Sequence, residues 1–168
     1  MNCKKNIEME SNEYMSNQHS FTITKSNNAT EKAGINYLQS KDERFINPDK
    51  ETRKKILEKF NIPKKFHRTF DLIYVENGKM ENGQVNIDDL LDITLIELKT
   101  TQKELPNNPL GFFFGATENE FELASLLGNQ YKFCFVCLHS NCPSYKVLTL
   151  AELDEIIQRK RIQYQINL

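Results

Sequence analysis

The sequence lacks the long apolar runs, the strong basic charge and the secretory features that define several large classes of protein. No apolar run approaches the roughly 20 residues that a membrane-spanning helix needs, and the polar segment 1–20 has no apolar stretch of the signal-peptide type. We therefore expect a cytoplasmic protein with no membrane partner. The net charge of −1 gives no overall signal for nucleic acid, although a local basic patch suffices to bind phosphate.

Several motifs of known chemistry are absent as well. The chain has no glycine-rich loop of the kind that cradles phosphates, and its serine, histidine and aspartate residues do not stand in contexts typical of a hydrolase triad. We find no internal repeat. In a cytoplasmic protein the four cysteines are expected to be reduced thiols and not a disulfide framework: Cys3, Cys134, Cys137 and Cys142.

The composition that is present suits a single folded domain. Of the 168 residues, 39% are hydrophobic and 27% are charged, which supplies enough apolar material for a core. Segment 1–28 is rich in Asn, Ser, Lys and Glu, and we expect a loosely ordered polar tail there. Residues 29–168 are then expected to form one domain.

Hydrophobic periodicity and turn residues predict a mixture of helices and strands. Helices are expected over 31–38, 50–60, 118–127 and 150–157, and strands over 70–75, 93–100, 110–114 and 131–138, while segments 21–24 and 161–168 could add short strands. Strand 93–100 is apolar apart from Glu97 and Lys99, so it should lie at the centre of the sheet with both faces covered. This order of elements predicts an α/β fold in which helices flank a central mixed sheet of four to five strands.

Glu97 and Lys99 interrupt the most apolar strand of the chain. Because they are two residues apart, their side chains project from the same face, and a buried charge is costly unless it is paired. They could pair with each other or with a neighbour, lie at a solvent-facing strand end, or line a site that binds a cation and an anion. The last explanation requires a further carboxylate.

Asp71 is the acid that hairpin geometry brings closest to Glu97. If the two strands form an antiparallel hairpin with these acids opposed, its centre falls beside the turn-forming pair Asn82-Gly83. Directly opposed residues share a face, with Cβ atoms roughly 5 Å apart. Two carboxylates at that spacing repel unless a proton or a cation lies between them, and Mg²⁺ takes such oxygen ligands.

These residues resemble the motif of the PD-(D/E)XK nuclease superfamily, which includes many type II restriction endonucleases. The segment Ile96-Glu97-Leu98-Lys99-Thr100-Thr101 is similar to that family's central strand, and the helix and strand that follow it are similar to those of several branches. The resemblance covers about residues 67–138. Phe70 departs from the pattern, since the family motif has proline before the first acid.

The resemblance implies a restriction-endonuclease-like fold with an acidic pair, Asp71 and Glu97, that binds Mg²⁺, for which Mn²⁺ can substitute. It implies that the backbone carbonyl of Leu98 contacts the metal and that Lys99 orients or activates the attacking water. Gln102, just past the motif, is a further polar candidate. In such a site the metal lowers the pKa of a bound water, and the lysine adds positive charge near the developing anion.

Other polar residues have both a functional and a structural interpretation. Glu120 could lie behind the catalytic residues or simply complete the helix cap that begins at Thr117. A basic segment precedes Asp71 and could either contact phosphates or form a solvated surface. Its candidate residues are Lys64, Lys65, His67 and Arg68.

A group of sulfur and imidazole side chains near the end of the last long strand invites interpretation as a zinc site: Cys134, Cys137, His139 and Cys142. On a strand, however, Cys134 and Cys137 point to opposite faces, because they are three residues apart. The interpretation as buried reduced thiols, which pack as small hydrophobic side chains, is therefore favoured.

Two functions from different classes follow. The first is a Mg²⁺-dependent deoxyribonuclease, such as a small type II restriction endonuclease, acting on double-stranded DNA and expected as a homodimer that cuts both strands. The second is a non-catalytic module that binds nucleic acid or protein on the same fold, in which Glu97 and Lys99 form a structural ion pair.

Overall fold

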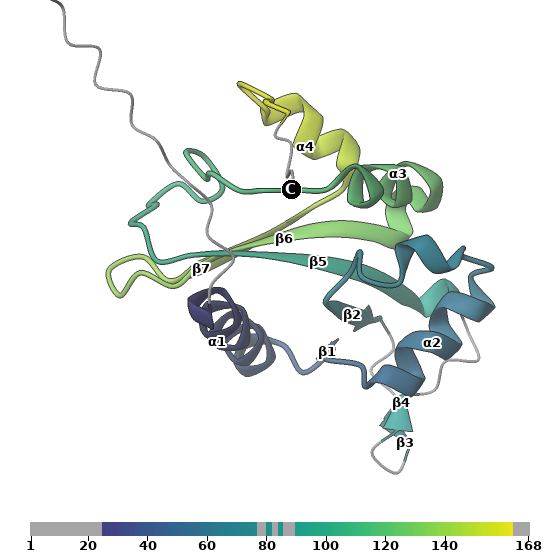
Figure 1. The fold of residues 1–168 in the computed structure, drawn as a ribbon. Coiled ribbons are helices and arrows are strands. Elements are labelled where there is room, and N and C mark those ends of the chain that lie inside the picture. Colours follow the sequence, from purple (N-terminus) through teal and green to yellow (C-terminus); the bar gives the residue numbers. More distant parts are fainter. Residues whose placement is uncertain (1–24, 77–79, 82–83, 86–89, 163–168) are drawn as a thin grey trace, which may run out of the picture.

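The computed structural model describes residues 25–76, 80–81, 84–85 and 90–162 (Figure 1). Within these residues the protein has the α/β fold that the sequence predicts, with a five-stranded sheet flanked by helices. The strand order is β1-β2-β5-β6-β7, in which β5 and β6 are parallel and the other neighbours are antiparallel. The sheet is therefore mixed, and β5 is its central strand.

The bounds of the described elements are as follows. The sheet contains β1 (Phe45–Ile46), β2 (Leu72–Val75), β5 (Ile93–Thr101), β6 (Tyr131–Cys137) and β7 (Ser144–Leu148), and a separate antiparallel pair contains β3 (Met80–Glu81) and β4 (Gln84–Val85). The helices are α1 (Lys25–Lys41), α2 (Lys50–Lys59), α3 (Glu118–Leu127) and α4 (Leu150–Ile156), with short 3₁₀ turns at Lys64–Phe66, Leu90–Asp92 and Gly128–Gln130.

Two apolar clusters lie on opposite faces of the sheet. Helix α1 covers one face, where the buried side chains are Ile35, Leu38, Phe45, Leu72, Ile96, Leu98, Cys134 and Val136. Helices α2, α3 and α4 cover the other face, whose larger cluster includes Ile56, Phe70, Ile73, Leu95, Leu123, Phe133, Phe135 and Leu153. Figure 1 shows α1 across the sheet from α3 and α4. Strand β5 is buried from Ile93 to Leu98, which confirms that both of its faces are covered.

Polar side chains cap the helices that cover the larger cluster. Asp49 caps α2 through its carboxylate, and Thr117 caps α3 through its hydroxyl. Thr149 and Glu152 form a complete capping box at the start of α4. These caps confirm the helix starts that the sequence predicts and satisfy N–H groups that have no partner within the helix.

The antiparallel pair β2–β5 has the register that the sequence predicts. Leu72 lies opposite Ile96, so Asp71 follows at the end of the pair, next to Glu97. This arrangement brings an acid from outside β5 to the charged part of the central strand. The turn predicted at Asn82-Gly83 lies outside the described residues.

The strand predicted over 110–114 is wrong. Successive turns occupy this segment, in which the N–H groups of Leu110 and Phe112 donate to carbonyls three residues earlier. From this loop the rings of Phe112 and Phe114 pack edge-on against Phe135. The aromatic residues thus contribute to the core without strand pairing, which the apolar pattern alone cannot distinguish from a strand.

Several boundaries also differ from the predictions. Helix α1 begins at Lys25, inside the expected polar tail, and extends to Lys41. The short strand β1 and the edge strand β7 are additions to the predicted elements. Segments 1–24 and 163–168, with most of the two suggested terminal strands, lie outside the described residues, and residues 161–162 are neither helix nor strand. No described helix is both long and apolar enough to cross a membrane.

Candidate active site

Lys99 lies between two buried glutamates. Its Nζ donates to Glu97 Oε1 over 2.7 Å and to Glu120 Oε2 over 2.8 Å. Glu97 and Lys99 come from β5, and Glu120 comes from the first turn of α3. Each glutamate is only 6% exposed. The three side chains therefore form a buried ion network between the central strand and the helix that covers it.

Thr117 fixes the orientation of Glu120. The hydroxyl of Thr117 accepts from the Glu120 N–H over 3.3 Å and donates to Glu120 Oε1 over 3.0 Å. The other carboxylate oxygen of Glu120 remains directed at Lys99. Glu120 thus takes part in the helix cap and in the ion network at once, so the two interpretations of this residue do not compete.

Asp71, the residue just before β2, also belongs to this network. Its Oδ2 accepts from the amide N–H of Leu98, the middle residue of the Glu-Leu-Lys motif, over 2.8 Å. On the other side, Arg53 of α2 donates to the backbone carbonyls of Phe70 and Asp71, and its guanidinium lies 4.5 Å from the centre of the Phe70 ring. Strand β5 and helix α2 together hold this acid in place.

The surroundings of the network make ionisation of Glu97 and Asp71 costly. Burial, followed by the neighbouring Asp71, raises the pKa of Glu97 well above its ordinary value. Burial also raises the pKa of Asp71, although the hydrogen bond from Leu98 partly opposes this. Burial lowers the pKa of Lys99, but Glu97 and Glu120 more than offset that effect. The pKa of Lys99 is therefore raised, and its ammonium group is charged at neutral pH.

The network holds more negative than positive charge. Asp71, Glu97 and Glu120 surround the single ammonium of Lys99, which leaves two negative charges in excess when all three acids are ionised. Glu97 Oε2 is buried and has no hydrogen-bond partner among the described residues. Such an atom is costly unless something binds it. Carboxylate oxygens are the ligands that a hard divalent cation such as Mg²⁺ or Mn²⁺ takes.

Three residues beside the network are absent from the site that the sequence predicts. Arg53 and Glu31, from helices α2 and α1, both interact electrostatically with Asp71. Tyr131 is fully buried at the start of β6, and burial, followed by Glu97, raises the pKa of its phenol. In the sequence Arg53 belongs to the basic run Arg53-Lys54-Lys55. The sequence gives no signal for Glu31 or Tyr131, because their approach to the network depends on how separate elements pack.

Leu98 and Gln102 are two further residues of the predicted site. The amide N–H of Leu98 donates to Asp71 Oδ2, while the contact of its carbonyl with a metal stays a prediction. Gln102 is exposed on the loop after β5 and takes part in none of the described contacts of the network. The strand ends at Thr101, so the period-two pattern that places Glu97 and Lys99 no longer applies at Gln102.

The predicted basic segment lies between α2 and β2 and is exposed at Lys64, Lys65, His67 and Arg68. The Lys65 ammonium is 2.6 Å and 2.7 Å from the two carboxylate oxygens of Glu122 on α3. The segment therefore runs beside the helix that covers the ion network. Lys65 is already engaged by an acid, which makes it the least suitable of the four to bind phosphate.

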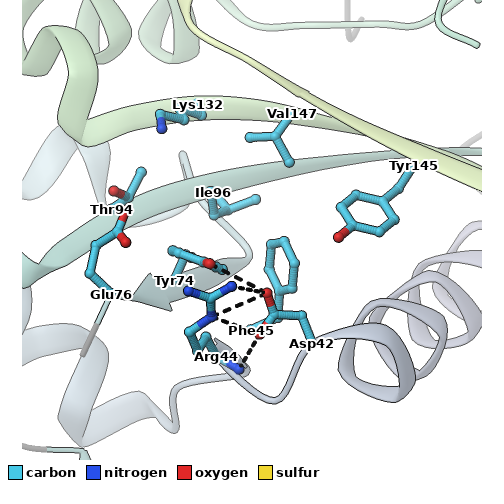
Figure 2. Close-up of a pocket in the computed structure, with 10 residues that line it drawn as sticks. All are labelled: Asp42, Arg44, Phe45, Tyr74, Glu76, Thr94, Ile96, Lys132, Tyr145 and Val147. Carbon is cyan, nitrogen blue, oxygen red and sulfur yellow. Dashed lines mark hydrogen bonds and ion pairs between the residues drawn. The ribbon is translucent and has the colours of Figure 1, made fainter. Parts of the chain in front are cut away.

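Figure 2 shows a pocket of about 290 Å³ on the other face of the sheet, beside the connection from α1 to β1. There the guanidinium of Arg44 is 2.7 Å from the carboxylate of Asp42, and the hydroxyl of Tyr74 donates to the same carboxylate over 3.3 Å. These polar groups are engaged with one another. The pocket shares no residue with the ion network, so we assign it no part in the candidate site.

A scan of protein-family models and searches of curated proteins and of solved structures find no match to this chain. The functional argument therefore depends on the chemistry and geometry of the site itself.

Proposed function

We propose that this chain is a Mg²⁺-dependent endonuclease with a restriction-endonuclease-like fold that hydrolyses phosphodiester bonds in double-stranded DNA, as type II restriction enzymes do. The observation that carries the proposal is the buried Glu97 Oε2, which has no hydrogen-bond partner among the described residues and belongs to a cluster of three acids around the single ammonium of Lys99. A divalent cation would supply both the missing partner and the missing charge.

Asp71 and Glu97 would hold the metal through their carboxylates, with the Leu98 carbonyl as a further ligand. When bound, Mg²⁺ supplies Lewis-acid chemistry, lowering the pKa of a bound water and polarising a phosphoryl oxygen. Lys99, protonated at neutral pH because of its two glutamate neighbours, would orient the attacking water and stabilise the charge that develops on the phosphate. It would not act as the base while it carries its proton.

Glu120 would act through Lys99 and not on the substrate. Its Oε2 accepts a second hydrogen bond from the ammonium, beside the one to Glu97, which fixes the position of the positive charge. The exposed Lys64, His67 and Arg68 precede Asp71 and would contact the DNA backbone. A homodimer would carry two such sites, which a cut through both strands requires.

The proposal is tested by incubating the purified full chain with supercoiled plasmid DNA and Mg²⁺ or Mn²⁺. We expect nicked and linear products, lost on chelation of the metal and reduced at least ~100-fold in Glu97→Gln and Lys99→Met. The matched controls are Glu118→Gln, an exposed acid in the same turn of α3 as Glu120, and Lys103→Met, an exposed lysine after β5. Both controls should cleave as the wild type does; cleavage that survives in both site variants rejects the proposal.

A second function, a non-catalytic module that binds nucleic acid or protein, is favoured by the two ion pairs of Lys99. The Lys99 ammonium is already bound to two carboxylates, which is also the arrangement of a purely structural ion network. This alternative predicts no divalent-cation binding at Asp71 and no cleavage of any plasmid tested. The wild type would still retain DNA on a gel, and this retention would be reduced in Lys64→Ala and Arg68→Ala.

A further inference from the structure

A second group of metal-ligand side chains lies at the end of the sheet where β5 and β6 finish. Ligand atoms of Glu104, His139 and Cys142 all lie within 4.8 Å of one another. Glu104 is on the loop after β5, whereas His139 and Cys142 belong to the connection between β6 and β7. Figure 1 shows these two loops at the same end of the sheet.

Cys137, the last residue of β6, places a second sulfur beside the Cys142 member of this group. Its Sγ is 3.7 Å from Cys142 Sγ. That separation is far too long for a disulfide, whose sulfurs are about 2.05 Å apart. It matches two thiolates on one tetrahedral zinc ion, because Zn–S bonds of about 2.3 Å at the tetrahedral angle place the sulfurs about 3.8 Å apart.

Backbone contacts hold the ligands in this arrangement. The N–H of Leu105 donates to Cys142 Sγ over 3.3 Å, and the Cys137 thiol donates to the Lys103 carbonyl over 3.3 Å. Both sulfurs are thus fastened to the loop that carries Glu104. A turn between His139 and Cys142, closed by a 3.1 Å backbone hydrogen bond, gives the change of direction that zinc ligands close in sequence require.

We propose that Cys137, His139, Cys142 and Glu104 bind one Zn²⁺ ion. Thiolate and imidazole ligands favour zinc over the hard cations suited to the acid network, so this site is chemically distinct from the proposed nuclease centre and does not depend on it. Four protein ligands would leave no open position, which makes the zinc structural. The ion would fasten the loop after β5 to the β6–β7 connection.

Cys134 takes no part in this site. It is fully buried in the cluster beneath α1, on the other face of the sheet. The expectation that Cys134 and Cys137 point to opposite faces is therefore consistent with a zinc site built from Cys137 and the residues that follow it. The spacing Cys-x-His-x-x-Cys, with the acid supplied from another loop, replaces the Cys-x-x-Cys pair that the sequence suggests first.

Cobalt substitution tests the proposal on the purified full chain, stripped of metal under reducing conditions. We expect one Co²⁺ per chain, with a thiolate-to-cobalt charge-transfer band and the intense visible bands of tetrahedral cobalt, and displacement of the cobalt by equimolar Zn²⁺. His139→Ala and Cys142→Ser should weaken binding at least ~10-fold, because even the loss of a group that only hydrogen-bonds a metal ligand typically costs ~10-fold. The controls Cys134→Ala and His67→Ala should bind as the wild type does.

Circular dichroism of each variant shows whether it remains folded, and His139 is only partly buried in a loop, so its replacement should be tolerated. Absence of the thiolate band in the wild type overturns the proposal. So does an unchanged spectrum in Cys142→Ser, or a Cys137–Cys142 disulfide found by mass spectrometry in protein that takes up no zinc after reduction.

Discussion

The amide N–H of Leu98 donates to Asp71 Oδ2 over 2.8 Å, and this contact fastens the first acid of the network to the strand that carries Glu97 and Lys99. The described pairing of β2 with β5 ends at Leu72, so the strand ladder does not itself hold the Asp71 side chain. The position of this acid depends on two hydrogen bonds with β5, one from its own N–H to the Ile96 carbonyl over 2.8 Å and one from Leu98 to its carboxylate, and on the hydrogen bond from Arg53 of α2 to its carbonyl.

Replacing Arg53 tests how much its hydrogen bonds from α2 contribute to the position of Asp71. Arg53→Met removes the hydrogen bonds to the Phe70 and Asp71 carbonyls, so we expect the free energy of unfolding to fall by about 2 kcal/mol and Mn²⁺ binding to weaken. Urea denaturation and calorimetric titration measure the two effects. The control is Lys54→Met, whose ion pair with Glu58 is highly exposed and worth less than about 0.5 kcal/mol. Equal behaviour of the two variants contradicts a positioning role for Arg53.

Lys99→Met leaves Glu97 and Glu120 buried without their shared cation. Breaking a buried ion pair by removing one partner typically costs about 3 kcal/mol, and we expect a loss of that size at about pH 8. The loss should shrink at about pH 5, because Glu97, whose pKa burial raises, can then take up a proton. Lys65→Met, at an exposed pair with Glu122, should cost less than about 1 kcal/mol at either pH. A pH-independent loss in Lys99→Met would show that the glutamates are not charged in the fold.

Glu97→Gln should change how stability depends on pH. The pKa of Glu97 is higher in the folded than in the unfolded protein, so ionised Glu97 is penalised only in the fold. With Mg²⁺ withheld, wild-type stability should therefore decline as pH rises above the ordinary glutamate pKa and level off above the folded pKa. A difference of one between the folded and unfolded pKa values lowers the free energy of unfolding by about 1.4 kcal/mol across that range.

The glutamine variant removes this dependence, because its side chain does not titrate. Denaturation curves collected between about pH 5 and about pH 9 should show a flatter profile than the wild type, and Glu118→Gln should leave the wild-type slope intact. Identical slopes in the wild type and Glu97→Gln would mean that the pKa of Glu97 is not raised by burial.

The cap and the ion network can be separated at α3. Thr117→Ala removes the helix cap and should cost about 1 kcal/mol of stability, with a modest fall in cleavage because Lys99 keeps its contact with Glu120. Glu120→Gln keeps a hydrogen-bonding side chain but loses the charge beside Lys99. It should therefore lower cleavage more than Thr117→Ala does. Activity should also be lost at a lower pH than in the wild type, because Lys99 then deprotonates more easily. If Thr117→Ala proves the more damaging to cleavage, Glu120 acts mainly through the cap.

The sequence predicts the part of the site that depends on strand geometry. The two-residue spacing places Glu97 and Lys99 on one face, and the hairpin register brings Asp71 to the same end. The capping pattern at Thr117 locates the start of α3, so Glu120 can be proposed as well. These features follow from local periodicity and from one pairing, which a single sequence contains.

The remaining features depend on packing between distant elements. Arg53 and Glu31 approach Asp71 only because α2 and α1 pack against the sheet, and no period in the sequence encodes that approach. The aromatic run near Phe113 reads as a strand in the sequence because apolar content does not distinguish a paired strand from a loop whose rings cover a core. The sequence suggests three of the proposed zinc ligands but disfavours the site, because it pairs Cys137 with Cys134, which lies on the other face of the sheet. Glu104 comes from a separate loop, and no spacing in the sequence indicates it.

The most direct test of the account is calorimetric titration of Mn²⁺ into the full chain at about pH 8. It is carried out in a Cys142→Ser background so that the thiolate site does not contribute. We expect binding of Mn²⁺ accompanied by proton release, because the pKa of Glu97 is raised well above its ordinary value, and loss of that binding in Asp71→Asn. Absence of binding, or binding unchanged by Asp71→Asn, would contradict it.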